Sequence, residues 1–140
     1  MESARESKPV ILQAQDQGRR YGMGRVIAIF KADEAETDAR YSVSEWILEP
    51  GFEGVGPHSH DTNDELFYVV DGKPEILVGR CWTAAGRGTF VRIPAGVTHD
   101  FRNRHSAVAR LLNIFIPGGF ERQMPSIVSR FEEQSAGELR

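Results

Sequence analysis

Short apolar runs recur along the chain, and each has the length of a β-strand. Turn-forming residues separate most of them, notably at Pro50-Gly51, Asp71-Gly72, Gly79-Arg80 and Pro94-Ala95-Gly96. Many short strands with such turns between them are typical of an all-β barrel or sandwich of the double-stranded β-helix (jelly-roll) kind. The predicted strands are residues 10–12, 25–30, 41–48, 66–70, 75–78, 89–93, 98–103 and 107–116.

The remaining segments predict how the strands are joined and how the chain ends. Residues 1–8 are polar and are expected to form a flexible leader before a single domain at 9–140. Residues 31–40 are rich in Ala, Asp and Glu, which indicates a solvated connection. Helix-forming residues at 120–131 are interrupted by Pro125, which predicts a short C-terminal helical tail of one or two helices at an end of the barrel.

The Asp71-Gly72 dipeptide follows an apolar run and predicts a tight β-hairpin, because glycine accepts the positive φ that such a turn needs. Gly96 in the Pro94-Ala95-Gly96 turn is expected to adopt a similar conformation.

Composition and charge exclude several classes of partner. The chain has 140 residues, of which 40% are hydrophobic and 26% charged, an ordinary globular balance. Its net charge is 17 minus 20, or −3, and Arg19-Arg20 is the largest basic group, so no nucleic-acid partner is expected. No apolar run approaches the ~20 residues of a membrane span, and the polar start does not resemble a signal peptide. Cys81 is the one cysteine, which fits the reducing cytoplasm expected for this protein.

Three of the four histidines lie close to a glutamate in two short stretches of sequence. His58 and His60 are two positions apart, so on an extended strand both side chains point to the same face. Glu65 opens the next predicted strand, and His99 begins a later one. Three imidazoles and one carboxylate suit a single divalent transition metal (Fe, Mn, Ni, Co, Cu or Zn), and the residue types do not choose among these ions.

These residues also form two motifs of a known family. Residues 58–72, with His58-x-His60, Glu65 and Gly72, resemble the first motif of the cupin superfamily. Residues 88–103, with Gly88, a Pro-x-Gly turn, His99 and Asn103, resemble the second motif at every position. One departure touches a turn: the glycine that usually precedes the first histidine by six residues is Phe52 here, and Gly51 lies one position earlier.

The resemblance carries expectations about fold and function. It implies a jelly-roll cupin barrel whose metal-binding core is at about 41–119, with His58, His60, Glu65 and His99 as metal ligands and Glu65 as the catalytic base. The flanks at 41–51 and 111–121 are similar to small single-domain bacterial cupins of the quercetin 2,3-dioxygenase-like type. A dioxygenase acting with O2 on an enolic or phenolic small molecule is therefore expected. A metal-assisted isomerase or lyase, or a non-enzymatic small-ligand-binding cupin, would use the same donors. Cupins commonly pair through edge or swapped strands, so a homodimer formed through residues 10–12 is expected.

Several residues keep two interpretations. Glu65 is either a metal ligand or a group that hydrogen-bonds to ligands while three histidines hold the metal. Phe67 and Phe101 either line an aromatic pocket or belong to the core. Asn103 is expected to stabilise backbone near the site, and His105 is expected to be exposed and without a role.

Overall fold

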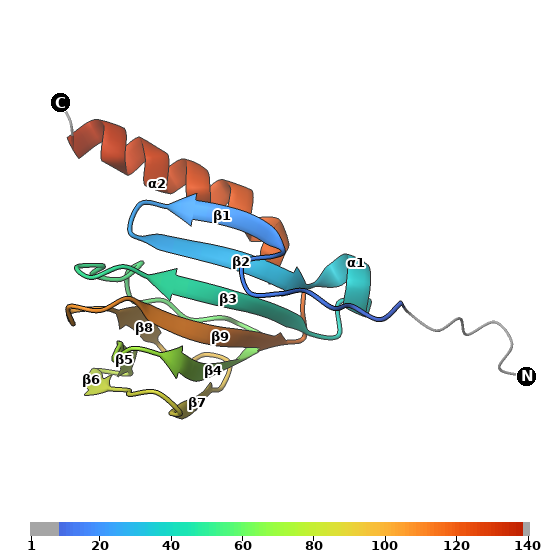
Figure 1. Ribbon diagram of the computed structural model, residues 1–140, viewed down its shortest axis with the longest axis horizontal. Helices are drawn as coiled ribbons and strands as arrows, with labels where there is room; N and C mark the ends of the chain where they lie inside the picture. Colours follow the sequence, from blue (N-terminus) through green and yellow to red (C-terminus); the bar gives the residue numbers. More distant parts are fainter. Residues whose placement is uncertain (1–8, 139–140) are drawn as a thin grey trace, which may run out of the picture.

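The computed structural model describes residues 9–138, and these fold into two antiparallel β-sheets and a C-terminal helix (Figure 1). The predicted leader at 1–8 lies outside the described residues. In sheet order, the six-stranded sheet contains β1 (Arg19–Met23), β2 (Val26–Ala32), β3 (Ser42–Leu48), β9 (Ala109–Ile116), β4 (Asp64–Asp71) and β7 (Phe90–Ile93). The three-stranded sheet contains β6 (Cys81–Ala84), β5 (Glu75–Val78) and β8 (His99–Arg102).

The all-β jelly-roll prediction is confirmed, but the sheets form a sandwich and do not close into a barrel. Strands β4 and β5 follow each other in the chain, yet β4 pairs with β7 and β9 whereas β5 pairs with β6 and β8. The Asp71-Gly72 turn therefore carries the chain from one sheet to the other, and the prediction of a tight hairpin there is wrong. Gly72 has φ +85°, and a Cβ at this position would lie 2.6 Å from the Ala109 Cα, so the bend packs directly on β9. The compact hairpin occurs one strand later, at Gly79 between β5 and β6.

Two predictions about the first part of the chain are also wrong. Residues 10–12 form no strand, and Val10 and Leu12 are exposed to solvent; β1 supplies the edge strand instead. The expected solvated connection at 31–40 contains the end of β2 and the short helix α1 (Glu34–Thr37). Asp33 before this helix is buried because its carboxylate accepts hydrogen bonds from the backbone N–H groups of Gly119 and Glu121. The charge of Asp33 suggested that it is exposed, but a turn distant in sequence supplies hydrogen-bond donors to its carboxylate.

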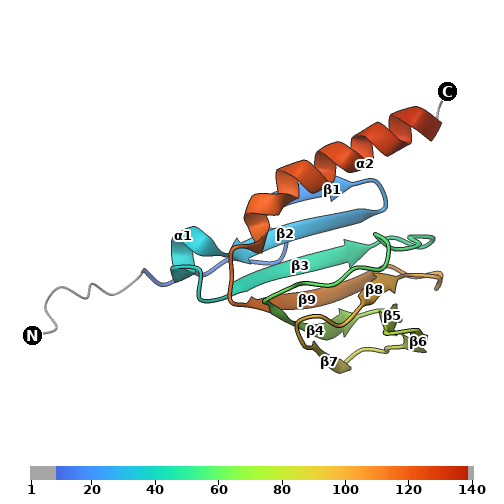
Figure 2. The same cartoon turned by 180° about the vertical axis from the view of Figure 1, so that it is seen from behind.

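The C-terminal tail is helical, as predicted. The 3₁₀ turn η2 (Phe120–Gln123) leads into α2 (Met124–Glu138), and α2 runs alongside β1 at the edge of the larger sheet (Figure 2). Pro125 lies in the first turn of α2, where its missing N–H has no helical acceptor to lose, so it begins the helix and does not interrupt it. None of the helices in the described residues is long and apolar enough to span a membrane.

The core lies between the sheets and is built from alternate residues of the strands. Ala109, Leu111 and Phe115 of β9 are buried, and the inward position between the last two is a polar residue, Asn113. A buried amide in an otherwise apolar row needs a polar partner nearby. That partner is Glu65, which lies on the adjacent strand β4.

Candidate metal centre

His58 and His99 are brought together by their own backbones. The two residues form an isolated antiparallel bridge in which His58 N donates to His99 O (3.0 Å) and His99 N donates to His58 O (2.8 Å). Their ring centroids lie 4.4 Å apart. The extended segment before β4 is thereby fixed to the start of β8, so two histidines distant in sequence lie side by side.

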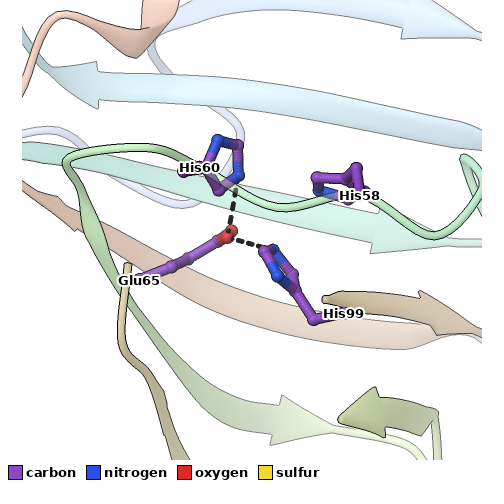
Figure 3. Close-up of side chains that lie close together, drawn as sticks. All are labelled: His58, His60, Glu65 and His99. Carbon is purple, nitrogen blue, oxygen red and sulfur yellow. Dashed lines mark hydrogen bonds and ion pairs between the residues drawn. The ribbon is translucent and has the colours of Figure 1, made fainter. Parts of the chain in front are cut away.

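Glu65 and His60 complete the group (Figure 3). Glu65 points inward from the start of β4 and is 4% exposed. Its Oε1 atom lies 2.6 Å from His99 Nε2 and 3.2 Å from His60 Nε2. One ligand atom from each of His58, His60, Glu65 and His99 lies within 4.8 Å of the others. The structure therefore brings together all four residues predicted from the sequence, here called the His/Glu cluster.

Backbone carbonyls fix the tautomers of two rings. His58 Nδ1 lies 2.8 Å from Gly56 O, and His99 Nδ1 lies 2.9 Å from Val97 O. A carbonyl oxygen only accepts hydrogen bonds, so each Nδ1 must carry the proton. The Nε2 lone pair of a neutral ring is then the one left for a ligand, and His99 Nε2 faces Glu65.

His60 is held differently. Its ring meets those of Phe115 and Phe120 edge to face, with centroids 5.0 and 5.5 Å away. Its backbone O accepts a hydrogen bond from Gly96 N at 2.8 Å. The contact from its Nε2 to Glu65 lacks hydrogen-bond geometry, so this buried nitrogen has no hydrogen-bond partner among the described residues. A buried nitrogen lone pair without a partner beside a carboxylate is what a cation would satisfy.

Asn113 orients Glu65, and the sequence analysis missed it. The Asn113 Nδ2 group donates to Glu65 Oε2 at 2.6 Å, which leaves Oε1 facing the histidines. The signal was present in the sequence, because Asn113 interrupts the apolar alternation of β9. Only the pairing of β9 with β4 shows which residue this amide serves.

Asp100 supports the loop that precedes His58, and it was also missed. Its carboxylate accepts hydrogen bonds from the N–H groups of Val55 and Gly56, both at 3.1 Å. A Cβ at Gly54 would lie 2.5 Å from Asp100 Oδ2, so the loop can approach the carboxylate only with glycine there. Asp100 thus positions the Gly56 carbonyl that holds the His58 ring.

The electrostatics of the cluster follow from burial and proximity. Burial alone would raise the pKa of Glu65, but contacts with the His60 and His99 rings and with Asn113 outweigh it and lower the pKa to about 2. Burial acts against protonation of His99 as well, yet its hydrogen bond to Glu65 raises the pKa of this imidazole. Desolvation lowers the pKa of His58. Without a bound cation, these shifts favour an ionised Glu65 carboxylate beside a protonated His99 ring.

A cavity of about 430 Å³ opens beside the cluster. Most of its wall is aromatic or aliphatic, and one side is the helix α2. Its lining residues include His58, His60, Glu65, Trp46, Phe52, Phe101, Phe115, Phe120, Ile127 and Phe131. The arrangement can hold a small flat molecule against the four donors.

The other residues considered in the sequence lie in the cavity wall, in the core or on the surface. Phe101 lines the cavity and Phe67 packs behind it in the core, so each interpretation holds for one of the two. Asn103 is buried and donates to the backbone oxygens of Leu48 and Ala107, as expected. His105 is exposed, also as expected.

The sequence matches a known family over the part that contains the cluster. The sequence model described as Cupin domain matches residues 44–115, more than half of the 140-residue chain. The chain is also 34% identical over 97 residues to an uncharacterised protein of Streptomyces coelicolor, a match that covers 62% of this chain and 89% of that protein.

Solved structures show the same fold at low sequence identity. A predicted oxalate decarboxylase from Thermotoga maritima superposes with a TM-score of 0.67 at 16% identity, covering 78% of this chain and 99% of the other. An RmlC-like cupin from Shewanella frigidimarina gives a TM-score of 0.64 at 18% identity, covering 76% and 89%. At such identities the likeness shows the fold alone.

Proposed function

The chain belongs to the cupin domain family, and from this premise we propose that it is a metal-dependent dioxygenase acting on an enolic or phenolic small molecule. One divalent transition metal would be held by His58, His60, Glu65 and His99. The observation that carries the proposal is the convergence of four donor atoms within 4.8 Å at the wall of an aromatic cavity.

The chemistry of the residues fits a metal. Two rings have Nδ1 tied to backbone carbonyls, so their Nε2 atoms are the donors. His60 Nε2 is buried without a hydrogen-bond partner among the described residues. In the absence of a cation, the 2.6 Å contact between His99 Nε2 and Glu65 Oε1 requires a proton between them. A divalent ion would replace that proton and satisfy all four groups.

When bound, such an ion supplies Lewis acidity toward a substrate oxygen and, for redox-active metals, electron exchange with O2. In a dioxygenase reaction both oxygen atoms enter the product, so no separate reductant is needed. Three neutral imidazoles and one carboxylate leave a net positive charge on a divalent site. This charge favours a substrate that binds as an enolate or phenolate.

Glu65 is the residue that would accept the proton of the substrate hydroxyl group. Its Oε1 faces the cluster, while Asn113 holds Oε2 and fixes the plane of the carboxylate. The proton would pass to Oε1 when the contact with His99 is released. Because the pKa of Glu65 is about 2 in the paired state, the carboxylate is a weak base until that contact is broken.

The aromatic part of the cavity wall would orient the substrate. Phe115 and Phe120 stack with ring centroids 4.4 Å apart, and both rings meet the His60 ring edge to face. Trp46 and Phe101 meet edge to face at 5.5 Å on the wall as well. An aromatic ring laid on such walls loses little conformational freedom and presents its hydroxyl to the cluster.

The test begins with metal analysis of protein purified without an affinity tag, because a histidine tag binds the same ions. Oxygen uptake is then measured with a panel of enols and phenols that includes flavonol-like diols. Stoichiometric metal and substrate-dependent oxygen uptake are expected. Turnover without oxygen uptake would instead indicate an isomerase or lyase, and a protein that takes up no metal would refute the proposal.

A further inference from the structure

One side of the cavity is formed by a face of α2, a helix that lies outside both cupin motifs. Its cavity-lining residues recur every three or four positions, which places them on a single face of the helix. They are Gln123, Ile127, Arg130, Phe131 and Gln134, here called the helix face. Gln123 is the last residue of η2, and the others belong to α2.

The helix face is fixed against the sandwich. Met124 at the start of α2 is fully buried. Further along, the Phe131 ring fills the space above the turn between β1 and β2, where a Cβ on Gly24 would lie 2.7 Å from Phe131 Cζ. Phe120 of η2 stacks on Phe115 of β9. The position of the helix face relative to the cavity therefore follows from packing at both ends.

Arg130 is distinguished from the other described arginines by its place in the cavity wall. It is the one arginine or lysine among the residues that line the cavity. Arg19, Arg110 and Arg122 each form ion pairs with glutamate, whereas Arg130 forms no hydrogen bond or ion pair with any residue that the structure describes. Its guanidinium has five donors and a fixed charge that nothing in the described chain uses.

We propose that Arg130 binds a carboxylate at one end of the substrate, while the other end reaches the His/Glu cluster. The part of this proposal that concerns the reacting end rests on the proposed function. Gln123 and Gln134 line the same cavity and offer further amide donors. The substrate class is a flat, apolar molecule with a hydroxyl group at one end and a carboxylate at the other.

Charge and shape both support this class of ligand. Glu65 is the one carboxylate among the cavity-lining residues, and it is paired with the histidines of the cluster, so the lining holds no second carboxylate to pair with Arg130. An arginine binds a carboxylate through two parallel hydrogen bonds, a geometry that lysine or an amide does not reproduce.

The experiment compares two matched probes, 3-(3,4-dihydroxyphenyl)propanoate and its uncharged amide. Both carry the same catechol, and they differ in the charge at the far end. Calorimetric titrations are made without oxygen on Zn²⁺-loaded and on metal-free full-length protein. The variants are Arg130→Gln, Arg130→Lys and, as a control exposed outside the cavity, Arg87→Gln.

The wild type is expected to bind the carboxylate at least about tenfold more tightly than the amide, the scale of one charge-assisted hydrogen-bonded pair. Arg130→Gln should abolish this preference without changing the affinity for the amide. Arg130→Lys should keep part of it, and Arg87→Gln all of it. Equal binding of the two probes to the wild type, no binding of the carboxylate at millimolar concentration, or an intact preference in Arg130→Gln would each overturn the proposal.

The same samples separate this inference from the proposed function. Metal content reports on the His/Glu cluster, and the ratio of the two affinities in metal-free protein reports on Arg130. A protein that takes up no metal but prefers the carboxylate through Arg130 would refute the metal site alone. A protein that takes up metal but shows no preference would refute the role of Arg130 alone.

Discussion

The two sides of the cavity hold their polar groups in opposite ways. In the His/Glu cluster, Glu65 and His99 are almost fully buried, and each has at least two polar contacts that fix its orientation. On the helix face, Arg130 and the two glutamines are exposed, and Arg130 has no polar partner among the described residues. One side is preorganised by the sheets, and the other is free to adapt to a ligand.

This difference matches the separate roles proposed for the two sides, which are metal binding and substrate recognition. Donors that must meet one small ion need positions fixed to within a fraction of an ångström, which strands and backbone hydrogen bonds provide. Recognition of a remote substrate group tolerates more movement, because a long arginine side chain can adjust. The two proposals accordingly assign the reaction chemistry to the motif region and the selectivity to the helix that follows it.

The largest effect on metal binding should come from removing a histidine of the His/Glu cluster. His99→Ala deletes one donor and also the partner of Glu65, so the metal affinity should fall by more than the ~10–100-fold expected for a supporting residue. The protein should remain folded, since its core is apolar. Metal content after dialysis measures the loss, with His105→Ala as the matched control. Full occupancy in His99→Ala would mean that the cluster is not the metal site.

Next in size is the effect of Glu65→Gln on catalysis. The amide oxygen can still donate to a metal, but the group no longer accepts a proton, so turnover should fall by ~10²–10⁴-fold while metal occupancy changes much less. Steady-state rates on the substrate found by oxygen uptake, alongside metal analysis, separate the two effects. Near-normal turnover with metal bound would leave Glu65 as a ligand and not a base.

A smaller effect on metal affinity is expected when the hydrogen bond from Asn113 to Glu65 is removed. Asn113→Leu replaces the amide with an apolar side chain that matches its buried neighbours in β9, but it frees Glu65 Oε2. Metal affinity should fall by about 10–100-fold, as for other residues that orient a ligand. Competition with a fluorescent chelator gives the affinity. An unchanged value would show that the strand alone fixes the carboxylate.

The pH dependence of metal-free protein should reveal the charged pair. The lowered pKa of Glu65, about 2, gives stability that is present above pH 4.5 and lost as the pH falls toward 2. The raised pKa of His99 gives stability that is present below pH 6.5 and lost as the pH rises through the raised value. The free energy of unfolding of the wild type minus that of Glu65→Gln should therefore be largest between about pH 4.5 and 6.5. Urea titrations across pH test this, and a flat difference would contradict it.

The smallest effect concerns backbone conformation beside the cluster. Gly96 has φ +86° in open space, and its N–H donates to His60 O, so Gly96→Val should cost about 1–3 kcal/mol of unfolding free energy through strain alone. Gly86→Val is the matched control, because Gly86 is equally uncrowded and lacks a positive φ. Equal unfolding midpoints for both variants would show that the turn relaxes without cost.

Local patterns predicted the jelly roll and the four residues of the cluster. Spacing placed His58 and His60 on one face, the starts of two further predicted strands supplied Glu65 and His99, and the resemblance to cupin motifs supported all four. Whether these residues hold a metal stays a prediction, as does the homodimer. The features that the sequence analysis missed depend on contacts between residues far apart in the chain. Asn113, for example, lies 48 residues from Glu65, and no local pattern links the two.

The same reason explains the errors in the fold. The turn at Asp71-Gly72 has hairpin chemistry, but the partners of β5 lie later in the chain and draw it into the other sheet. Asp33 looked exposed because its hydrogen-bond donors are contributed by residues 119 and 121. The helix-forming residues at 120–131 predicted a helical tail, but the cavity that this tail lines exists only after the sandwich forms.

The carbonyl groups that hold the histidine rings affect how easily this site can evolve. A main-chain oxygen is present whatever side chain a residue bears, so Val97 can be exchanged without losing the acceptor for His99 Nδ1. Gly56 is more restricted, because its φ of +104° excludes most side chains, although the acceptor itself is equally generic. The side chain at position 97 can therefore change over generations while the His99 ring keeps its tautomer, whereas position 56 is held to glycine by its backbone conformation.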